Sequence, residues 1–319
     1  MRRHLLAAIT LAASASLSAQ ELAVQAGALR VKEADESSFS AGVSYTHPVN
    51  NHLALSLGYL NEGHPTDHHR DGVTGQVWLR SGANQPGWSF GAGVGQYFYF
   101  DTSDFGQGRY TNDHGWAALY SLQAIYHYQD SRWYNQLQLN RILPAGGKDS
   151  TTSLMVGVGY QFNGVKGDKL HLDGPSTDDS VTLLGGQAIT NSTSSERARV
   201  AALEYRRAIG RYVDWTVTAI DEGEGKDSAS QSKRNGVATQ LWLIRSLNPK
   251  VEIGMGAGFY FNDKVPDGEG QRSHKAGLVS IASRYHLASR IVGEFSWNRV
   301  VTDYHRDADL LLVGLGYSF

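Results

Sequence analysis

Apolar and polar residues alternate with a period of two over most of the chain, and no segment sustains a helical period. Leu53, Leu55 and Leu57, for example, alternate with Ala54 and Ser56. Such alternation predicts β-strands that have one apolar face. Counted between turn signals, these runs give sixteen predicted strands, near residues 22–30, 38–48, 52–61, 71–82, 87–100, 115–128, 132–142, 152–162, 181–190, 197–208, 212–221, 236–246, 250–262, 275–287, 290–301 and 309–319.

The two halves of the chain share an ordered series of short matches at an offset of about 160 residues. Similarity of this kind indicates a duplicated structural unit. Each copy holds eight predicted strands, so we predict a tandem duplication. The matches pair Asn61-Glu62-Gly63 with Asp221-Glu222-Gly223, Arg70-Asp71-Gly72-Val73 with Arg234-Asn235-Gly236-Val237, Phe98-Tyr99-Phe100 with Phe259-Tyr260-Phe261, Tyr126-His127 with Tyr285-His286, Asn140-Arg141 with Asn298-Arg299, and segment 157–162 with 314–319.

The connections between the predicted strands alternate in length. Short turns such as 50–51 and 130–131 alternate with longer polar segments such as 62–70 and 101–114. Short turns on one rim and longer loops on the other are typical of a transmembrane antiparallel β-barrel. A soluble β-sandwich predicts neither this asymmetry nor the aromatic clusters found at the ends of the predicted strands.

The last predicted strand places Leu311, Val313, Leu315, Tyr317 and Phe319 on one face and ends on an aromatic residue. This segment resembles the C-terminal assembly signal of Gram-negative outer-membrane β-barrel proteins. The resemblance implies a protein of the bacterial outer membrane that the barrel assembly machinery inserts and that contacts outer-membrane lipid and lipopolysaccharide. It implies nothing about a substrate.

The N-terminus and the composition narrow the class of protein. Residues 1–19 combine Arg2 and Arg3, a short apolar stretch and a run of small residues, which predicts a secretory signal peptide. The absence of Cys excludes a disulfide scaffold and a thiolate metal site. No apolar run is long enough for a membrane-spanning helix. A net charge of -2 gives no reason to expect nucleic acid as a partner.

Sixteen strands can close as one barrel or as two barrels of eight. We predict repeats at 20–163 and 181–319, joined by a periplasmic linker at 164–180 that is much longer than the other turns on that rim. Small residues at inward positions, such as those of segment 91–95, suit a narrow lumen filled by side chains. Polar inward residues in the second copy suit a single wide barrel instead. We favour two tandem barrels, and the single barrel remains the alternative.

The densest polar cluster lies in segment 62–71. Its His64, His68 and His69, together with Glu62 and Asp71, are residue types that bind divalent metals. A polar loop at the rim of a barrel is more commonly just solvated, so we predict neither a metal nor a cofactor.

A carboxylate and a guanidinium recur in both copies of this segment, as Glu62 with Arg70 and as Glu222 with Arg234. Held on adjacent strands, they would pair and pin the loop, which is the interpretation we favour. Alternatively, the two arginines would contact phosphates of lipopolysaccharide.

A second group of polar residues is predicted to face the lumen or to lie at the end of a strand close to it. His127 and His286 occupy matching positions, and a lumen His can act as a general base or simply as a hydrogen-bonding group, which we favour. Lipid A deacylases of the outer membrane carry a His-x-Ser pair, and no His here has Ser two residues later. The predicted lumen residues are Gln76, Trp78, His127, Glu204, Arg206, Gln240, Trp242, Glu252, Arg284, His286 and Glu294.

Three functions follow as hypotheses: an outer-membrane barrel with a structural or surface-binding role, a porin-like passive channel for small solutes, and an enzyme that modifies lipid A or phospholipid. We favour the first, with no catalytic residue assigned.

Replacing the terminal aromatic residue tests the assembly signal. We expect Phe319→Ser to reduce the amount of folded protein in the outer membrane, because the closing strand loses the group that the resemblance assigns to recognition. Heat-modifiable mobility in gels measures the folded fraction, and Phe319→Tyr serves as the aromatic control. Normal folding of Phe319→Ser would contradict the assignment.

Overall fold

A computed structural model describes residues 20–319 except 33, 66, 83–85, 107–108, 147, 163–178, 193–194, 211, 224–233, 264–265, 268–269 and 272–274. The predicted signal peptide at 1–19 and nearly all of the predicted linker at 164–180 lie outside the described residues.

All of the regular secondary structure in the described residues is β. The first eight strands are β1 (Glu21–Val31), β2 (Glu36–Pro48), β3 (Leu53–Asn61), β4 (His68–Arg80), β5 (Gly87–Asp104), β6 (Tyr110–His127), β7 (Trp133–Pro144) and β8 (Thr151–Gln161). The others are β9 (Ser180–Thr190), β10 (Arg197–Gly210), β11 (Val213–Glu222), β12 (Asn235–Asn248), β13 (Val251–Asn262), β14 (Pro266–Asp267), β15 (Gly270–Gln271), β16 (Lys275–His286), β17 (Ile291–Val301) and β18 (Ala308–Ser318). No helix among the described residues is long and apolar enough to cross a membrane.

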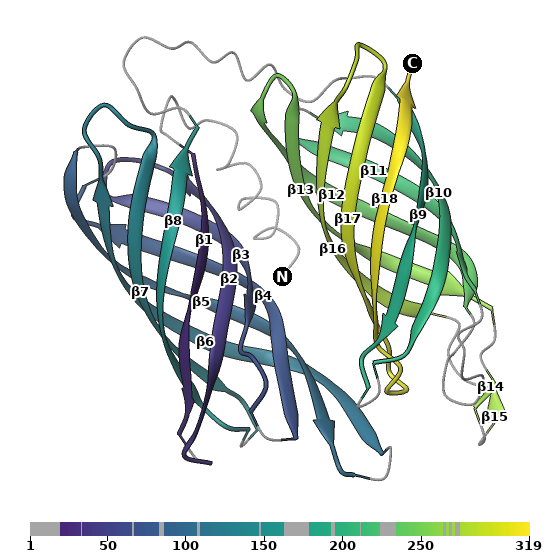
Figure 1. The fold of residues 1–319 in the computed structure, drawn as a ribbon, viewed down its shortest axis with the longest axis horizontal. Coiled ribbons are helices and arrows are strands. Elements are labelled where there is room, and N and C mark those ends of the chain that lie inside the picture. The colour runs from purple at the N-terminus through teal and green to yellow at the C-terminus, as the bar shows by residue number, and fades with distance from the viewer. Residues whose placement is uncertain are drawn as a thin grey trace, which may run out of the picture. The chain divides into compact units, whose positions relative to one another are not determined.

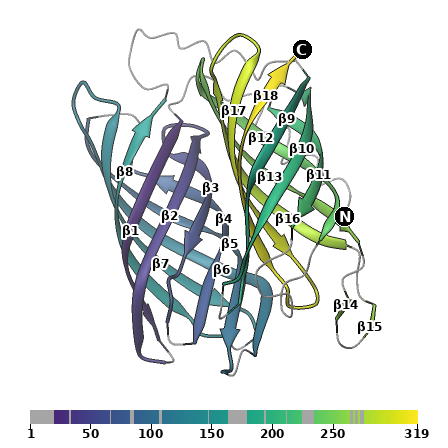
Figure 2. The ribbon, with the colours of Figure 1, turned by 45° about the vertical axis from the view of Figure 1, so that its right-hand side comes forward.

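All of these strands except β14 and β15 form two closed antiparallel barrels of eight, so the preferred prediction of two tandem barrels is confirmed. In the first barrel β8 pairs with β1, with Val24 opposite Val158 (Figure 1). In the second barrel β18 pairs with β9, which lies between β18 and β10 (Figure 2). The alternative of one sixteen-stranded barrel is wrong, because β8 closes onto its own copy.

Most predicted strands match the observed ones to within a few residues, and one hairpin differs. The segment 101–114 was expected to be a loop, but β5 runs to Asp104 and β6 begins at Tyr110. Polar residues made this segment look like a loop, whereas the backbone pairing continues through them. A further difference is the short hairpin of β14 and β15, which the sequence pattern did not indicate.

Each barrel has two different rims. In the first barrel, the turns β2–β3, β4–β5 and β6–β7 lie at the same rim as the start of β1 and the end of β8, and we call this the short-turn rim. The remaining connections, including segment 62–67, form the loop rim. The second barrel follows the same plan, with its long connections after β11 and β13 at the loop rim.

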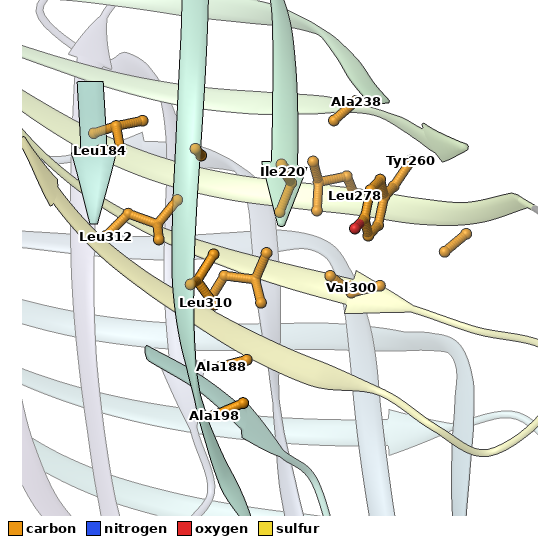
Figure 3. Packing of buried hydrophobic residues seen from close by; sticks show 13 residues of the cluster. Leu184, Ala188, Ala198, Ile220, Ala238, Tyr260, Leu278, Val300, Leu310 and Leu312 are labelled. Carbon is orange, nitrogen blue, oxygen red and sulfur yellow. The ribbon is translucent and has the colours of Figure 1, made fainter. Parts of the chain in front are cut away.

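Side chains alternate between the outside and the inside of each barrel. Outward positions carry large apolar residues, such as Leu79, Val156 and Leu183, each about two-thirds exposed. Inward positions are buried, and their side chains fill the interior. In the second barrel the inward residues nearer the loop rim form one apolar cluster (Figure 3), made of Leu184, Ala188, Ala198, Val200, Ala202, Ile220, Ala238, Tyr260, Ala276, Leu278, Val300, Leu310 and Leu312.

Inward glycines make room for a buried tryptophan in each barrel. A Cβ added to Gly93 would lie 2.8 Å from ring carbons of Trp78, and one added to Gly256 would lie 2.6 Å from the ring of Trp242. The indole Nε1 atoms donate to Ser56 Oγ at 2.8 Å and to Thr216 Oγ1 at 3.0 Å. The narrow, filled lumen therefore depends on small residues facing large ones across neighbouring strands.

We expect Gly93→Ala to lower the free energy of unfolding by about 1–3 kcal/mol, since its methyl group overpacks against Trp78. Urea unfolding in detergent micelles measures this change. Gly82→Ala is the control, because a Cβ at Gly82 meets nothing within 4 Å. Equal stability of the two variants would contradict the close packing.

Candidate functional site: the two barrel interiors

A buried ion pair closes the first barrel at its loop rim. Glu62 follows β3, and the inward-facing Arg70 lies on β4; both side chains are about 2% exposed. Arg70 donates through Nε and Nη2 to the two carboxylate oxygens of Glu62, and Thr151 Oγ1 also donates to Glu62. Charge-assisted, two-point pairing of this kind fixes both side chains.

The same guanidinium reaches across the mouth of the barrel. Arg70 Nη1 donates to the carbonyl oxygen of Asp149, in the connection before β8, at 3.1 Å. Its Cζ also lies 5.8 Å from the ring centroid of Tyr99. The side chain therefore ties β3, β4 and the last loop of the barrel together.

The second barrel repeats this arrangement at equivalent positions. Arg234 donates to Glu222 through Nε and Nη2 at 2.9–3.1 Å, and its Nη1 donates to the carbonyl oxygen of Arg306 at 3.0 Å. Arg306 lies in the connection before β18, which corresponds to the last loop of the first barrel. Because Arg70 and Arg234 are buried and paired with carboxylates, they do not face lipid, as contact with phosphates of lipopolysaccharide would require.

The structure divides the candidate metal ligands of segment 62–71 among different partners: His64 and His69 lie together beside Asp71, His68 lies against Asp101, and Glu62 pairs with Arg70. His64 stacks on His69 with ring centroids 4.3 Å apart, and His69 Nδ1 lies 2.8 Å from the carbonyl oxygen of Gly63. Asp71 accepts a hydrogen bond from Tyr59. Within the described part of the chain, no group of three or more His, Asp or Glu could hold a metal ion. His64 lies in the loop and is only partly buried. This partial burial lowers its pKa, and the charge of the neighbouring His69 lowers the pKa further.

A charged cluster lies next to the Glu62–Arg70 pair. Asp101 on β5 is 3.0 Å from His68 Nδ1 and 3.1 Å from Lys148 Nζ. Lys148 also contacts Asp113 at 2.7 Å. Burial acts to lower the pKa of Lys148, but the hydrogen bonds and charges of Asp113 and Asp101 outweigh it and raise the pKa. Sequence reasoning missed Asp101 and Lys148, because it assigned Asp101 to a loop.

Neutral amides fill the middle of the first barrel. Gln136 donates to Gln138 at 2.6 Å, Gln138 donates to Asn140 at 2.7 Å, and Ser121 donates to the same Asn140 oxygen. The predicted lumen residue Gln76 donates to Ser121 at 2.9 Å. These amides were missed, although the alternation of Gln136, Gln138 and Asn140 with Leu on β7 carries the signal.

The interior of the first barrel holds a cavity of about 30 Å³, lined by these amides and by Trp78 and Met155. This volume accommodates roughly one or two water molecules. Nearer the short-turn rim, Arg80 donates to both carboxylate oxygens of Glu21 at 2.8–2.9 Å. His127 lies 3.2 Å from the amide nitrogen of Gln161, and its ring is 5.3 Å from that of Tyr134.

Ionic side chains fill the corresponding part of the second barrel. Arg206 lies 2.9 Å from Glu204, 3.3 Å from Glu294 and 3.6 Å from Asp214, with its Cζ 4.8 Å from the ring centroid of Trp242. These contacts cross the interior, because β10, β11 and β17 supply the charges. Asp214 was not predicted, although it continues the inward series of Thr216 and Thr218 on β11.

The remaining predicted lumen residues extend this network. Arg284 lies 3.5 Å from Glu252 and 3.4 Å from Glu294, and His286 lies 3.3 Å from Glu252. Gln240 donates to Ser280 at 2.8 Å, as Gln76 does to Ser121 in the first barrel. The network leads directly to Trp242, beyond which the apolar cluster of Figure 3 fills the loop-rim side.

No protein-family model and no curated protein matches the sequence. Several solved structures of outer-membrane β-barrels are similar to a little less than half of the chain, which is about one barrel. The N-terminal β-barrel domain of Pseudomonas aeruginosa OprF is 15% identical, with a TM-score of 0.37, covering 44% of this chain and 97% of that one. Neisserial surface protein A is 14% identical, with a TM-score of 0.37, covering 45% and 97%.

Ail of Yersinia pestis, solved in complex with the heparin analogue sucrose octasulfate, is 13% identical, with a TM-score of 0.36, covering 46% of this chain and 99% of that one. At these identities and TM-scores the likenesses carry no inference about function.

Breaking the closing ion pair tests its role. We expect Glu62→Gln to lower the free energy of unfolding by about 3–5 kcal/mol, because Arg70 stays buried without a carboxylate. Unfolding in urea measures the change. The double variant Glu62→Leu with Arg70→Met should regain much of the loss, and a single variant as stable as the unaltered protein would contradict the pairing argument.

Proposed function

We propose that this protein is an outer-membrane protein whose two barrels are closed, membrane-anchored units with a structural or surface-binding role. The observation that carries the proposal is the combination of an apolar outer surface with an interior filled by paired side chains. By analogy with other outer-membrane barrels, which have short turns on the periplasmic side, we place the short-turn rim in the periplasm and the loop rim at the cell exterior.

Aromatic residues support the placement in a membrane. Trp88, Tyr126 and Trp133 face outward near the short-turn rim of the first barrel, while Phe98 and Trp116 face outward nearer the loop rim. Trp88 and Phe98 are roughly ten residues apart on β5, which is about 34 Å along the strand and about 26 Å along the axis of a barrel with typical tilt. This span matches the apolar band of about 25 Å that outer-membrane barrels present between their aromatic girdles.

The filled interiors argue against the porin-like alternative. A barrel of eight strands has an interior just wide enough for side chains to fill. In the first barrel the cavity of about 30 Å³ lies beneath the Glu62–Arg70 pair, and in the second barrel the apolar cluster and the ionic network occupy the interior. Passage of a solute would require breaking buried ion pairs.

The enzymatic alternative has less support. The neighbours of His127 are the Gln161 amide and the Tyr134 ring, and His286 lies against Glu252. In these contacts neither His is paired with a Ser hydroxyl. Insertion by the barrel assembly machinery, export by a signal peptide and contact with lipopolysaccharide belong to the same proposal and come from the sequence.

Conductance measurements separate the closed barrel from the porin. Purified protein reconstituted in planar lipid bilayers is expected to give no stable conductance steps, because paired side chains and the apolar cluster occupy the two interiors. A porin of known conductance added to the same bilayer controls for sensitivity, and protease protection verifies insertion. Reproducible, salt-dependent steps from inserted protein would overturn the proposal in favour of the channel.

A further inference from the structure

An outward-facing row of three polar side chains, two of them arginines, crosses three strands of the first barrel near its loop rim. Arg141 on β7 is paired in register with Thr152 on β8, and Thr152 is paired with Arg30 on β1. All three positions have outward parity. We refer to Arg141, Thr152 and Arg30 as the cationic row.

Arg141 has hydroxyl partners in place of a carboxylate. Its Nη1 donates to Thr152 Oγ1 at 2.9 Å, and its Nη2 donates to Ser150 Oγ at 2.6 Å. Among the described residues, no Asp or Glu forms an ion pair with it. Arg30 pairs with Asp35, but both side chains are at least two-thirds exposed. An exposed pair of this kind is worth little, so it does not hold Arg30 against a competing anion.

The second barrel provides a matched comparison at the same positions. There Arg299 on β17 is paired in register with Asp309 on β18, and Asp309 with Ile189 on β9. Arg299 Nε and Nη2 donate to the two carboxylate oxygens of Asp309 at 2.7 and 3.2 Å. The net charge of these three residues is therefore zero in the second barrel. In the first barrel Thr152 stands in place of Asp309 and Arg30 in place of Ile189, so the three residues carry two positive charges.

An apolar surface continues from the cationic row toward the short-turn rim on the same three strands. The next outward positions are Leu139, Leu154 and Ala28, which are again adjacent in register. Below them lies a groove of about 600 Å³, with Leu137, Val156 and Ala26 at its near end and Trp88 and Tyr126 beside it. Leu137 is four residues from Arg141, about 14 Å along the strand.

We propose that the cationic row and the near end of the groove together bind one phosphorylated lipid of the outer leaflet, with a phosphate on Arg141 and Arg30 and an acyl chain that runs over Leu139 and Leu154 to the end of the groove formed by Leu137, Val156 and Ala26. The inference rests on the proposed function, since it requires the loop rim to lie in the outer leaflet. Guanidinium groups recognise phosphate through charge-assisted, two-point hydrogen bonds. The apolar groove fits an apolar chain attached to that phosphate. Free phosphate has no such chain, whereas the lipid A part of lipopolysaccharide has both the phosphate and the acyl chain.

Native mass spectrometry of the full chain, folded in detergent micelles and titrated with bisphosphorylated lipid A, tests the phosphate contact. We expect Arg141→Gln and Thr152→Asp each to weaken binding about tenfold, the first by removing the cation and the second by giving it the carboxylate that the second barrel has. Arg299→Gln, the matched change in the second barrel, should alter binding by less than about twofold. Both altered positions of the first barrel face outward, so Arg141→Gln and Thr152→Asp should retain heat-modifiable mobility, and the same gel shift is measured for Arg299→Gln.

The groove is tested separately. Ala26→Phe fills it from an outward position and should reduce retention of lipid A, while Gly185→Phe at the equivalent position of the second barrel should not. A Cβ at Gly185 has open space, with its nearest contact at 3.9 Å. Dephosphorylated lipid A should bind at least tenfold more weakly than the phosphorylated form, and millimolar inorganic phosphate should not displace it.

The outcomes distinguish this inference from the function on which it rests. Folded protein that binds both forms of lipid A equally, or that loses binding as much in Arg299→Gln as in Arg141→Gln, overturns the site alone. Equal retention of phosphatidylglycerol and lipid A overturns the outer-leaflet assignment. Failure of the unaltered protein to fold in any lipid or micelle overturns the proposed membrane function as well.

Discussion

Closure of each sheet onto its own first strand is the constraint on which the other features depend. In a membrane, backbone groups must be satisfied by the protein itself, and a closed barrel does so without leaving an edge. With eight strands, closure leaves an interior only as wide as side chains. Every inward residue must therefore pack against or pair with another, which explains why tryptophans face glycines and why the inward charges lie against opposite charges.

The two barrels have the same strand topology, but their interiors are filled by different kinds of side chain. Amide groups such as Gln136 and Gln138 satisfy each other in the first barrel without any charge. The second barrel uses carboxylates around Arg206 and an apolar cluster instead. The two barrels agree at two kinds of position: a Trp that packs over a Gly, and a Glu–Arg pair beneath the last loop. At these positions the close approach of neighbouring strands, or the closure of the barrel mouth, leaves the least choice of side chain.

The sequence predicted the strands, their parity and the Glu–Arg pairs, because these depend on alternation and on adjacent strands. It favoured two barrels without excluding one, since β1 and β9 share the alternation that β8 needs in a partner, although not the same residues, and only three-dimensional closure distinguishes them. Contacts across a lumen, such as Arg70 with the Asp149 carbonyl, depend on register around the whole circumference. Asp101 was misassigned because polar composition was taken as a loop, although the hairpin continues beyond the apolar band.

The even number of strands in each barrel has a consequence for how such a chain can change. The start of β1 and the end of β8 lie at the same rim, as do the start of β9 and the end of β18. A copy of this kind therefore begins and ends at the same rim of its own barrel, so the chain can gain or lose a copy without adding a further strand to cross that barrel. Each barrel is a complete closed sheet, so its interior residues can change independently of those in the other barrel.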